Sequence, residues 1–283
     1  MRDSRAIAQV VGRQIAQAAT VLRPDVVVAL EAACARETNA RARNVLSMLL
    51  ENAHLSAAKD LPLCQDTGTV WVLLEAGEDV TGFPPDLQQA IDAEVARVYK
   101  EQGLRASTVR DALCDRSNPG DNTPAFIEYR RRLGKGLTVS TLLKGAGSDN
   151  ASQVVMLPPA AGKQGIMDAL TSLVREKGSA ACPPLVIGVG VGTTFDKVAS
   201  LAKRALLRPV GQASGVAQVA QFEAELLAAV NATGVGPAGL GGATSALGVA
   251  VETAPAHIAA LPVAFNLGCC AMRSASEVVR AIQ

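Results

Sequence analysis

The first sixty residues place apolar side chains at the three- and four-residue spacing of amphipathic helices. One helix is indicated over residues 7–15, and a second opens at Pro24, because proline is tolerated in the first helical turn. Apolar positions over residues 45–50 mark a third helix. We therefore expect a helical N-terminal region over residues 1–60.

After residue 61 the pattern changes to short apolar runs that alternate with helical segments, which is typical of α/β folds. The strands Phe126 to Arg131 and Leu137 to Leu143 flank Gly134-Lys135-Gly136, which predicts a hairpin. We expect an α/β domain over residues 61–283, with a further boundary near residue 160. The other expected strands are 69–74, 185–188, 247–252 and 258–265, and the expected helices are 85–99, 163–177, 194–207 and 218–231.

Composition narrows the class of protein. Hydrophobic residues make up 49% of the 283 residues but aromatic residues only 3%, so the core must consist mainly of Ala, Val, Leu and Ile. A net charge of +1 without a basic run provides no general attraction for nucleic acid or anionic membranes. The start does not resemble a signal peptide, and the apolar stretch 258–272 is too short to span a bilayer. We expect a cytoplasmic protein whose function lies in a local site.

Three of the six cysteines lie in strings that ordinary packing does not need: Cys64-Gln65-Asp66-Thr67-Gly68, Ala181-Cys182-Pro183-Pro184 and Asn266-Leu267-Gly268-Cys269. The prolines after Cys182 predict extended backbone directly before a buried strand. Three thiolates that hold an iron-sulfur cube leave one iron open to bind a substrate as a Lewis acid. Cys34 is expected to be an inert core residue and Cys114 is undecided. Of the adjacent Cys269 and Cys270, we expect one to face the common centre.

The remaining polar strings have a structural and a functional interpretation. Asn118-Pro119-Gly120-Asp121-Asn122-Thr123-Pro124 and Lys144-Gly145-Ala146-Gly147-Ser148-Asp149-Asn150 are acceptable turns, and they are also candidate substrate contacts. The glycines of residues 188–192 lack the third glycine of the dinucleotide fingerprint, so we do not expect nucleotide binding. His257 is by default a buried imidazole, and Arg105 and Arg116 are by default surface charges.

Together these strings resemble the iron-sulfur hydro-lyases that comprise class I fumarases and L-tartrate dehydratases. The resemblance runs through six motifs in the family's order, from Pro62-Leu63-Cys64-Gln65-Asp66 to Asn266-Leu267-Gly268-Cys269, and includes Gly239-Leu240-Gly241-Gly242. It implies that a 4Fe-4S cluster is held by Cys64, Cys182 and Cys269, with Cys270 outside the ligand set. A scaffold or assembly subunit with structural zinc is the alternative of another class, although such zinc normally takes four protein ligands.

The resemblance also implies roles for other residues. Asp66 and His257 match active-site residues, and Gln65, Asp66, Arg105 and Gly147 match the substrate-binding positions. Single-chain relatives carry a second domain after the last cysteine motif, so this chain is expected to be an α subunit. A β subunit would supply the general base, and two αβ pairs are expected to form an α2β2 assembly. The expected reaction is malate to fumarate and water, with L-tartrate or another C4 or C5 dicarboxylate as the alternative substrate.

Overall fold

In the computed structural model, residues 3–279 are described and fall into two compact units. Within this range the first unit holds residues 3–23, 55–146 and 273–279, and the second holds residues 24–54 and 147–272. The units are therefore built from interleaved stretches of the chain. This division differs from the expected boundaries at residue 60 and near residue 160, because strands and helices distant in sequence share one core.

The helical N-terminal region is confirmed as α1 (Ser4–Thr20), α2 (Pro24–Arg36) and α3 (Ala40–Lys59). Asp3 caps α1, because its Oδ1 accepts the backbone N–H of Arg5 at 2.9 Å. Pro24 opens α2 as expected. However, α1 belongs to the first unit and α2 to the second, so this region is not a separate domain.

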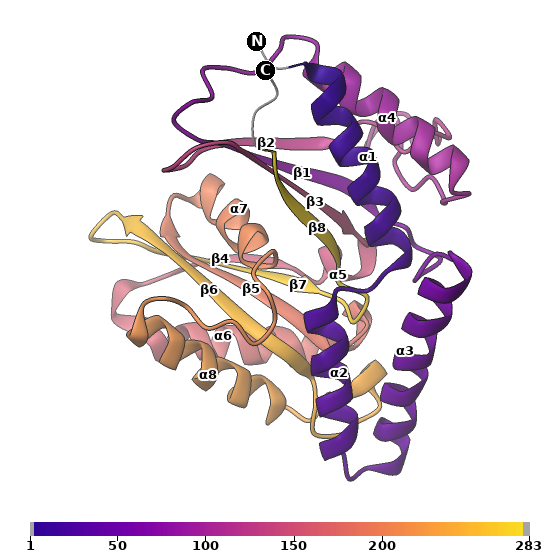
Figure 1. The fold of residues 1–283 in the computed structure, drawn as a ribbon. Helices are drawn as coiled ribbons and strands as arrows, with labels where there is room; N and C mark the ends of the chain where they lie inside the picture. The colour runs from indigo at the N-terminus through magenta and orange to yellow at the C-terminus, as the bar shows by residue number, and fades with distance from the viewer. Residues whose placement is uncertain (1–2, 280–283) are drawn as a thin grey trace. The chain divides into compact units, whose positions relative to one another are not determined.

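The first unit contains a sheet with the strand order β2-β1-β3-β8. The helices α1 and α4 (Leu87–Glu101) pack against each other and against one face of this sheet (Figure 1). Val70, Val72 and Leu74 of β1 face the helices, in the two-residue period of a strand. The strands are β1 (Thr69–Ala76), β2 (Phe126–Arg131), β3 (Leu137–Lys144) and β8 (Arg273–Val279).

The predicted hairpin is wrong, although both of its strands form. β1 lies between β2 and β3, pairing with β2 in parallel and with β3 in antiparallel register. The glycine turn pairs with the end of β1 instead, because Gly77 N–H donates to Gly136 O and Glu78 N–H donates to Gly134 O. A local sequence pattern identifies the strands but does not reveal that a third, more distant strand inserts between them.

The second unit contains a sheet with the strand order β4-β7-β5-β6. The helices α6 (Gly162–Lys177) and α8 (Ala217–Asn231) cover one face, and α7 (Phe195–Ala205) covers the other (Figure 1). β5 pairs with β6 in parallel and with β7 in antiparallel register. The strands are β4 (Gln153–Leu157), β5 (Leu185–Thr193), β6 (Ala246–Ala256) and β7 (Leu261–Gly268).

The glycines of the string 188–192 lie inside β5 and allow α7 to pack closely on it. A Cβ on Gly188 would lie 2.1 Å from Ala202 O, and one on Gly190 would lie 2.6 Å from Val198 O. These two glycines therefore serve helix–strand packing, as glycine does where another backbone approaches closely.

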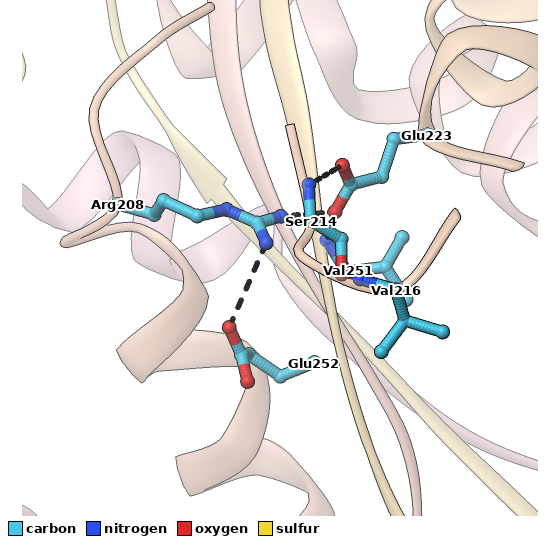
Figure 2. A network of polar contacts seen from close by, with 6 residues as sticks. All are labelled: Arg208, Ser214, Val216, Glu223, Val251 and Glu252. Carbon is cyan, nitrogen blue, oxygen red and sulfur yellow. Dashed lines mark hydrogen bonds and ion pairs between the residues drawn. The ribbon is translucent and has the colours of Figure 1, made fainter. Parts of the chain in front are cut away.

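A buried carboxylate ties the segment after α7 to α8 and β6 (Figure 2). Glu223 of α8 accepts the N–H of Val251 at 2.8 Å and that of Ser214 at 2.9 Å, and it forms an ion pair with Arg208. The side chains of Arg208 and Glu223 are only 14% and 7% exposed. Arg208 also lies 3.9 Å from Glu252. This network fixes the segment against the sheet.

Within residues 3–279, none of the helices combines the length and the apolar character needed to cross a membrane.

Candidate active site

Cys64 lies in a loop between α3 and β1, residues 63–68, which we call the first cysteine loop. Leu63 anchors its start, because this residue is buried and its N–H donates to Ala19 O at 2.8 Å. Gly68 ends it with a φ of +81°, and a Cβ there would lie 2.8 Å from the carbonyl carbon of Lys144. The thiol of Cys64 is partly exposed and lies 3.3 Å from Gln65 Oε1. The loop thus presents Cys64 from two fixed ends.

Asp66 joins this loop to the string that follows β3. Its Oδ1 accepts the N–H of Gly68 at 3.1 Å, and its Oδ2 accepts the N–H of Ala146 at 2.9 Å. Ala146 is the first residue of the short helix α5 (Ala146–Asn150). Since Asp66 remains partly exposed, its carboxylate is oriented by backbone groups while still accessible to a ligand.

Arg105 is placed beside the first cysteine loop by its backbone. Its carbonyl oxygen accepts a hydrogen bond from Thr67 Oγ1 at 2.5 Å. Its side chain is exposed and makes no ion pair with any of residues 3–279. Arg116, by contrast, donates to Ala112 O on the exposed part of its own loop, in agreement with the expected surface charge. Of these two arginines, Arg105 is the one with a link to Cys64 and Asp66.

Cys182 and Cys269 lie in the second unit, at the end of the sheet where β5 begins and β7 ends. Their segments are joined directly, because the N–H of Cys270 donates to Cys182 O at 3.0 Å. Cys182 is exposed, and Cys269 is partly exposed with its Sγ 3.6 Å from Ala271 O. The expected extended backbone at Cys182 is wrong: its φ of +55° and ψ of +66° are left-handed, a region that also avoids the α conformation disfavoured before proline.

Two glycine strings approach the segment before Cys182. A Cβ on Gly147 would lie 3.0 Å from Ala180 O, and a Cβ on Gly239 would lie 2.7 Å from Ser179 Cβ. The N–H of Ala238 also donates to Pro183 O at 2.8 Å. The second unit therefore gathers three predicted strings, those of Gly147, Cys182 and Gly239, around one strand entrance.

His257 lies at the other end of the same sheet. It follows β6, whose last residue Ala256 is opposite Thr193 at the end of β5, whereas Cys182 precedes the start of β5. The nine residues of β5 span roughly 26 Å at the usual rise of a strand. His257 is exposed, and its Nδ1 accepts the N–H of Ala259 at 3.1 Å. The structure therefore does not bring His257 together with Cys182 and Cys269 within one chain, and the default of a buried imidazole is wrong.

The other cysteines have different surroundings. Cys34 is partly exposed, rather than in the core as expected, and its Sγ lies 3.8 Å from Arg43 O. Cys114 is exposed. No disulfide joins any of the six cysteines, all of which lie within the described residues.

The donor chemistry of the three predicted ligands fits an iron-sulfur cluster, because thiolates are the protein ligands of such clusters. Cys64 is in the first unit, and Cys182 and Cys269 are in the second. Over the described part of the chain, no three Cys, His, Asp or Glu side chains are gathered closely enough to hold a metal ion. The fit therefore rests on accessible thiols in each unit and on the direct link between the Cys182 and Cys269 segments.

Three buried polar side chains bind the first cysteine loop; sequence reasoning missed Tyr99 and Arg273, and it named Asn122 only within a string of candidate substrate contacts. Arg273 donates to Asp66 O, Tyr99 lies within hydrogen-bond distance of Thr67 O and Gly68 O, and Asn122 donates to Gly68 O. Burial raises the pKa of Tyr99 above its ordinary value, so its hydroxyl keeps its proton. The available signal was weak, since a tyrosine in an amphipathic helix or an arginine at the start of a strand has many ordinary explanations.

Comparisons with known proteins cover almost the whole chain. The family model described as fumarate hydratase matches residues 8–278. A protein of Methanocaldococcus jannaschii, provisionally named L(+)-tartrate dehydratase subunit alpha, is 35% identical over 97% of this chain and 98% of its own length. The L(+)-tartrate dehydratase subunits alpha of Escherichia coli K12 and Shigella sonnei are each 27% identical over 97% of this chain and 91% of their own length.

Proposed function

Because the chain belongs to the fumarate hydratase family, we propose that it is the α subunit of an iron-sulfur enzyme that interconverts malate with fumarate and water. Membership of the family makes the chain a hydro-lyase subunit. The observation that carries the site assignment is the first cysteine loop, where Cys64 is accessible and the neighbouring Asp66 is held by two backbone N–H groups.

We assign the cluster ligands to Cys64, Cys182 and Cys269. Support comes from the accessibility of their thiols and from the hydrogen bond that joins the segments of Cys182 and Cys269. When bound, a 4Fe-4S cluster with one open iron supplies a Lewis acid for the hydroxyl group of the substrate. Cys270 stays outside the set, and its backbone N–H serves the link to Cys182.

We assign substrate binding to Gln65, Asp66, Arg105 and Gly147. The exposed guanidinium of Arg105 can take a substrate carboxylate through two parallel hydrogen bonds. The amide of Gln65 is exposed next to Cys64, and its oxygen lies close to the thiol. Asp66 is a candidate for moving a proton, because its carboxylate is oriented by Gly68 and Ala146 and remains accessible.

The name subunit alpha, carried by the relatives, implies a partner β subunit for this chain. Dehydration removes the hydroxyl group from C2 of malate and a proton from C3, and we assign the base that takes this proton to the β subunit. We further propose an α2β2 assembly. The position of His257 supports it, because a residue roughly 26 Å from the cysteine end of its own sheet can serve that end only from another copy of the chain.

L-tartrate dehydration is the second candidate, and the names of the relatives favour it. Malate and L-tartrate are both 2-hydroxy dicarboxylates of four carbons and differ by one hydroxyl group. Anaerobic dehydration assays on malate and on L-tartrate, with the chain co-purified with its partner, distinguish the two candidates. A higher kcat/KM for malate supports our proposal; a clear preference for L-tartrate replaces it with the second candidate.

A scaffold subunit with structural zinc would give a colourless protein without dehydration activity, and membership of a hydro-lyase family argues against it. We also propose that the enzyme acts in the cytoplasm, because a reducing compartment keeps its cysteines as thiols. Fractionation of cells that produce the chain, with activity measured in each fraction, tests this location.

A further inference from the structure

Three consecutive carbonyl groups of the first cysteine loop accept hydrogen bonds from buried side chains. Arg273 Nη1 donates to Asp66 O at 2.6 Å. Tyr99 Oη lies 2.9 Å from Gly68 O and 3.2 Å from Thr67 O, so its single proton is shared between them. Asn122 Nδ2 donates to Gly68 O at 3.1 Å. We call Tyr99, Asn122 and Arg273 the carbonyl clamp.

Asn122 connects the first cysteine loop to the segment that follows Arg105. Its Nδ2 binds Gly68 O, while its Oδ1 accepts the N–H of Ser107 at 2.7 Å and lies 3.3 Å from Thr108 Oγ1. The residue is fully buried and has a φ of +59°, a left-handed conformation that asparagine tolerates better than most residues. Both ends of one amide thus hold two strings that the proposed function assigns to the same substrate.

Arg273 places a guanidinium beneath the same loop. Arg273 is 2% exposed, and its Nε has no hydrogen-bond partner among the described residues. Burying a charged group without full pairing is unfavourable, so an apolar residue would serve a purely structural purpose better. Gly145 leaves room for the arrangement, because a Cβ there would lie 3.2 Å from Asp66 Oδ2 and 3.4 Å from Arg273 Nη2. The guanidinium and the Asp66 carboxylate therefore both lie close to Gly145, where a larger residue would crowd them.

We propose that Tyr99, Asn122 and Arg273 are positioning residues that hold the first cysteine loop in one conformation, with its carbonyl groups fixed and the side chains of Cys64 and Asp66 presented to their ligands. The inference rests on the proposed function for what those ligands are. A loop ordered in advance loses less conformational entropy when it binds, so the clamp strengthens cluster retention and substrate binding without touching either.

The test compares the full-length chain with the variants Asn122→Ala and Tyr99→Phe. Gln14→Ala is the matched control, because Gln14 is also a buried amide in the first unit and binds Val139 O and Thr141 Oγ1 of β3 rather than the loop. Hydrogen exchange of the amides of residues 63–68 is measured before reconstitution with iron and sulfide. After reconstitution, the loss of cluster absorbance in air is measured on the chain, and the values of KM and kcat are measured on its complex with the β subunit.

Loop amides are expected to exchange about tenfold faster or more in Asn122→Ala, in line with the loss of one buried hydrogen bond, and at the wild-type rate in Gln14→Ala. The reconstituted clamp variants are expected to lose their cluster absorbance about several-fold faster than wild type, because each lacks one buried hydrogen bond to the loop. Arg273→Lys should retain more cluster than Arg273→Ala, because it keeps one charged donor.

Unchanged loop exchange in folded Asn122→Ala and Tyr99→Phe would overturn the clamp, and so would an equal increase in Gln14→Ala. If Asn122→Ala does not fold, Tyr99→Phe decides, since it removes only a hydroxyl group. The failure of the proposed function is distinguishable: a wild-type chain that takes up no iron contradicts the cluster, while the exchange rates still decide whether the clamp orders the loop.

Discussion

The carboxylate of Asp66 accepts the backbone N–H of Ala146 at 2.9 Å, which ties the loop that carries Cys64 to the first residue of α5. Eighty positions separate the two residues in the sequence. Two strings that the sequence suggested as parts of one site are therefore joined in the first unit by a direct hydrogen bond. The same carboxylate also accepts the N–H of Gly68, so its orientation is set by backbone on two sides.

Asp66→Asn is expected to lower turnover by about 10²- to 10⁴-fold, the usual effect of losing a group that transfers a proton. Iron content should not change, because Cys64 and its loop ends are retained. The matched control is Asp92→Asn, since Asp92 likewise accepts a backbone N–H, that of Ala125, in the same unit. Turnover and iron content of the purified complexes are the measurements. Full turnover in Asp66→Asn would remove this residue from the chemistry.

His257→Gln is expected to reduce turnover and to leave iron and sulfide content at the wild-type level. The cluster should be retained because His257 lies roughly 26 Å along β5 from the end near Cys182 in its own chain. His54→Gln is the control, because His54 is the other histidine of the sequence and is exposed on α3. Full turnover in His257→Gln, or loss of the cluster from this variant, would contradict the prediction.

Tyr99 gives the first unit a dependence on alkaline pH. Burial raises the pKa of its hydroxyl in the folded chain above the unfolded value of about 10. The unfolded chain therefore releases this proton first as pH rises, so the contribution of Tyr99 to stability is complete below pH 10 and is lost progressively above it. Urea denaturation at a series of pH values from about 8 upward, a range that includes the tyrosine pKa, measures how the free energy of unfolding changes with pH.

Tyr99→Phe should remove that part of the alkaline loss of stability, and should cost about 1 kcal/mol at neutral pH through the missing hydrogen bond. Tyr129→Phe is the comparison, because Tyr129 is half-exposed on β2. Burial also raises the pKa of Tyr129, but protein covers this side chain much less than that of Tyr99. An alkaline slope that is identical in Tyr99→Phe and wild type would contradict the role of the buried hydroxyl.

Part of the site was accessible from the sequence because each of its strings is local. The Cys64 and Cys182 strings combine a thiol with glycine or proline, and those residue types restrict the backbone wherever the chain folds. The helices and most strands were predicted for a similar reason, since their apolar period is written in consecutive residues. The roles of the site residues and the cluster remain predictions.

The rest depends on contacts between distant residues. β1 separates β2 from β3, which no pattern within residues 126–143 reveals. β4 was missed because it has only five residues, and β8 because its serine and glutamate positions leave no continuous apolar run. Asn122 reaches Gly68 across 54 positions, and Arg273 reaches Asp66 across 207. Such pairings follow from the assembled core, and an isolated polar residue gives no sign of them.

Glu223 supports the second unit through its network with Arg208, Ser214 and Val251 (Figure 2). Glu223→Ala is expected to lower the free energy of unfolding by about 3 kcal/mol, because it removes the close ion pair of the largely buried Arg208 and the acceptor of two backbone N–H groups. Glu225→Ala is the control on the same helix, where Glu225 accepts a hydrogen bond from Gln221 at the exposed surface. Urea denaturation checks both, and equal small losses would contradict a structural network.

The iron and sulfide content of the complex purified without oxygen tests the central claim most directly. We expect a brown protein with about four iron and four sulfide per chain. Cys64→Ser, Cys182→Ser and Cys269→Ser should each lose this content, and Cys114→Ser, at an exposed thiol, should keep it. A colourless protein with one zinc per chain, or full iron content in any of the three ligand variants, would contradict the account.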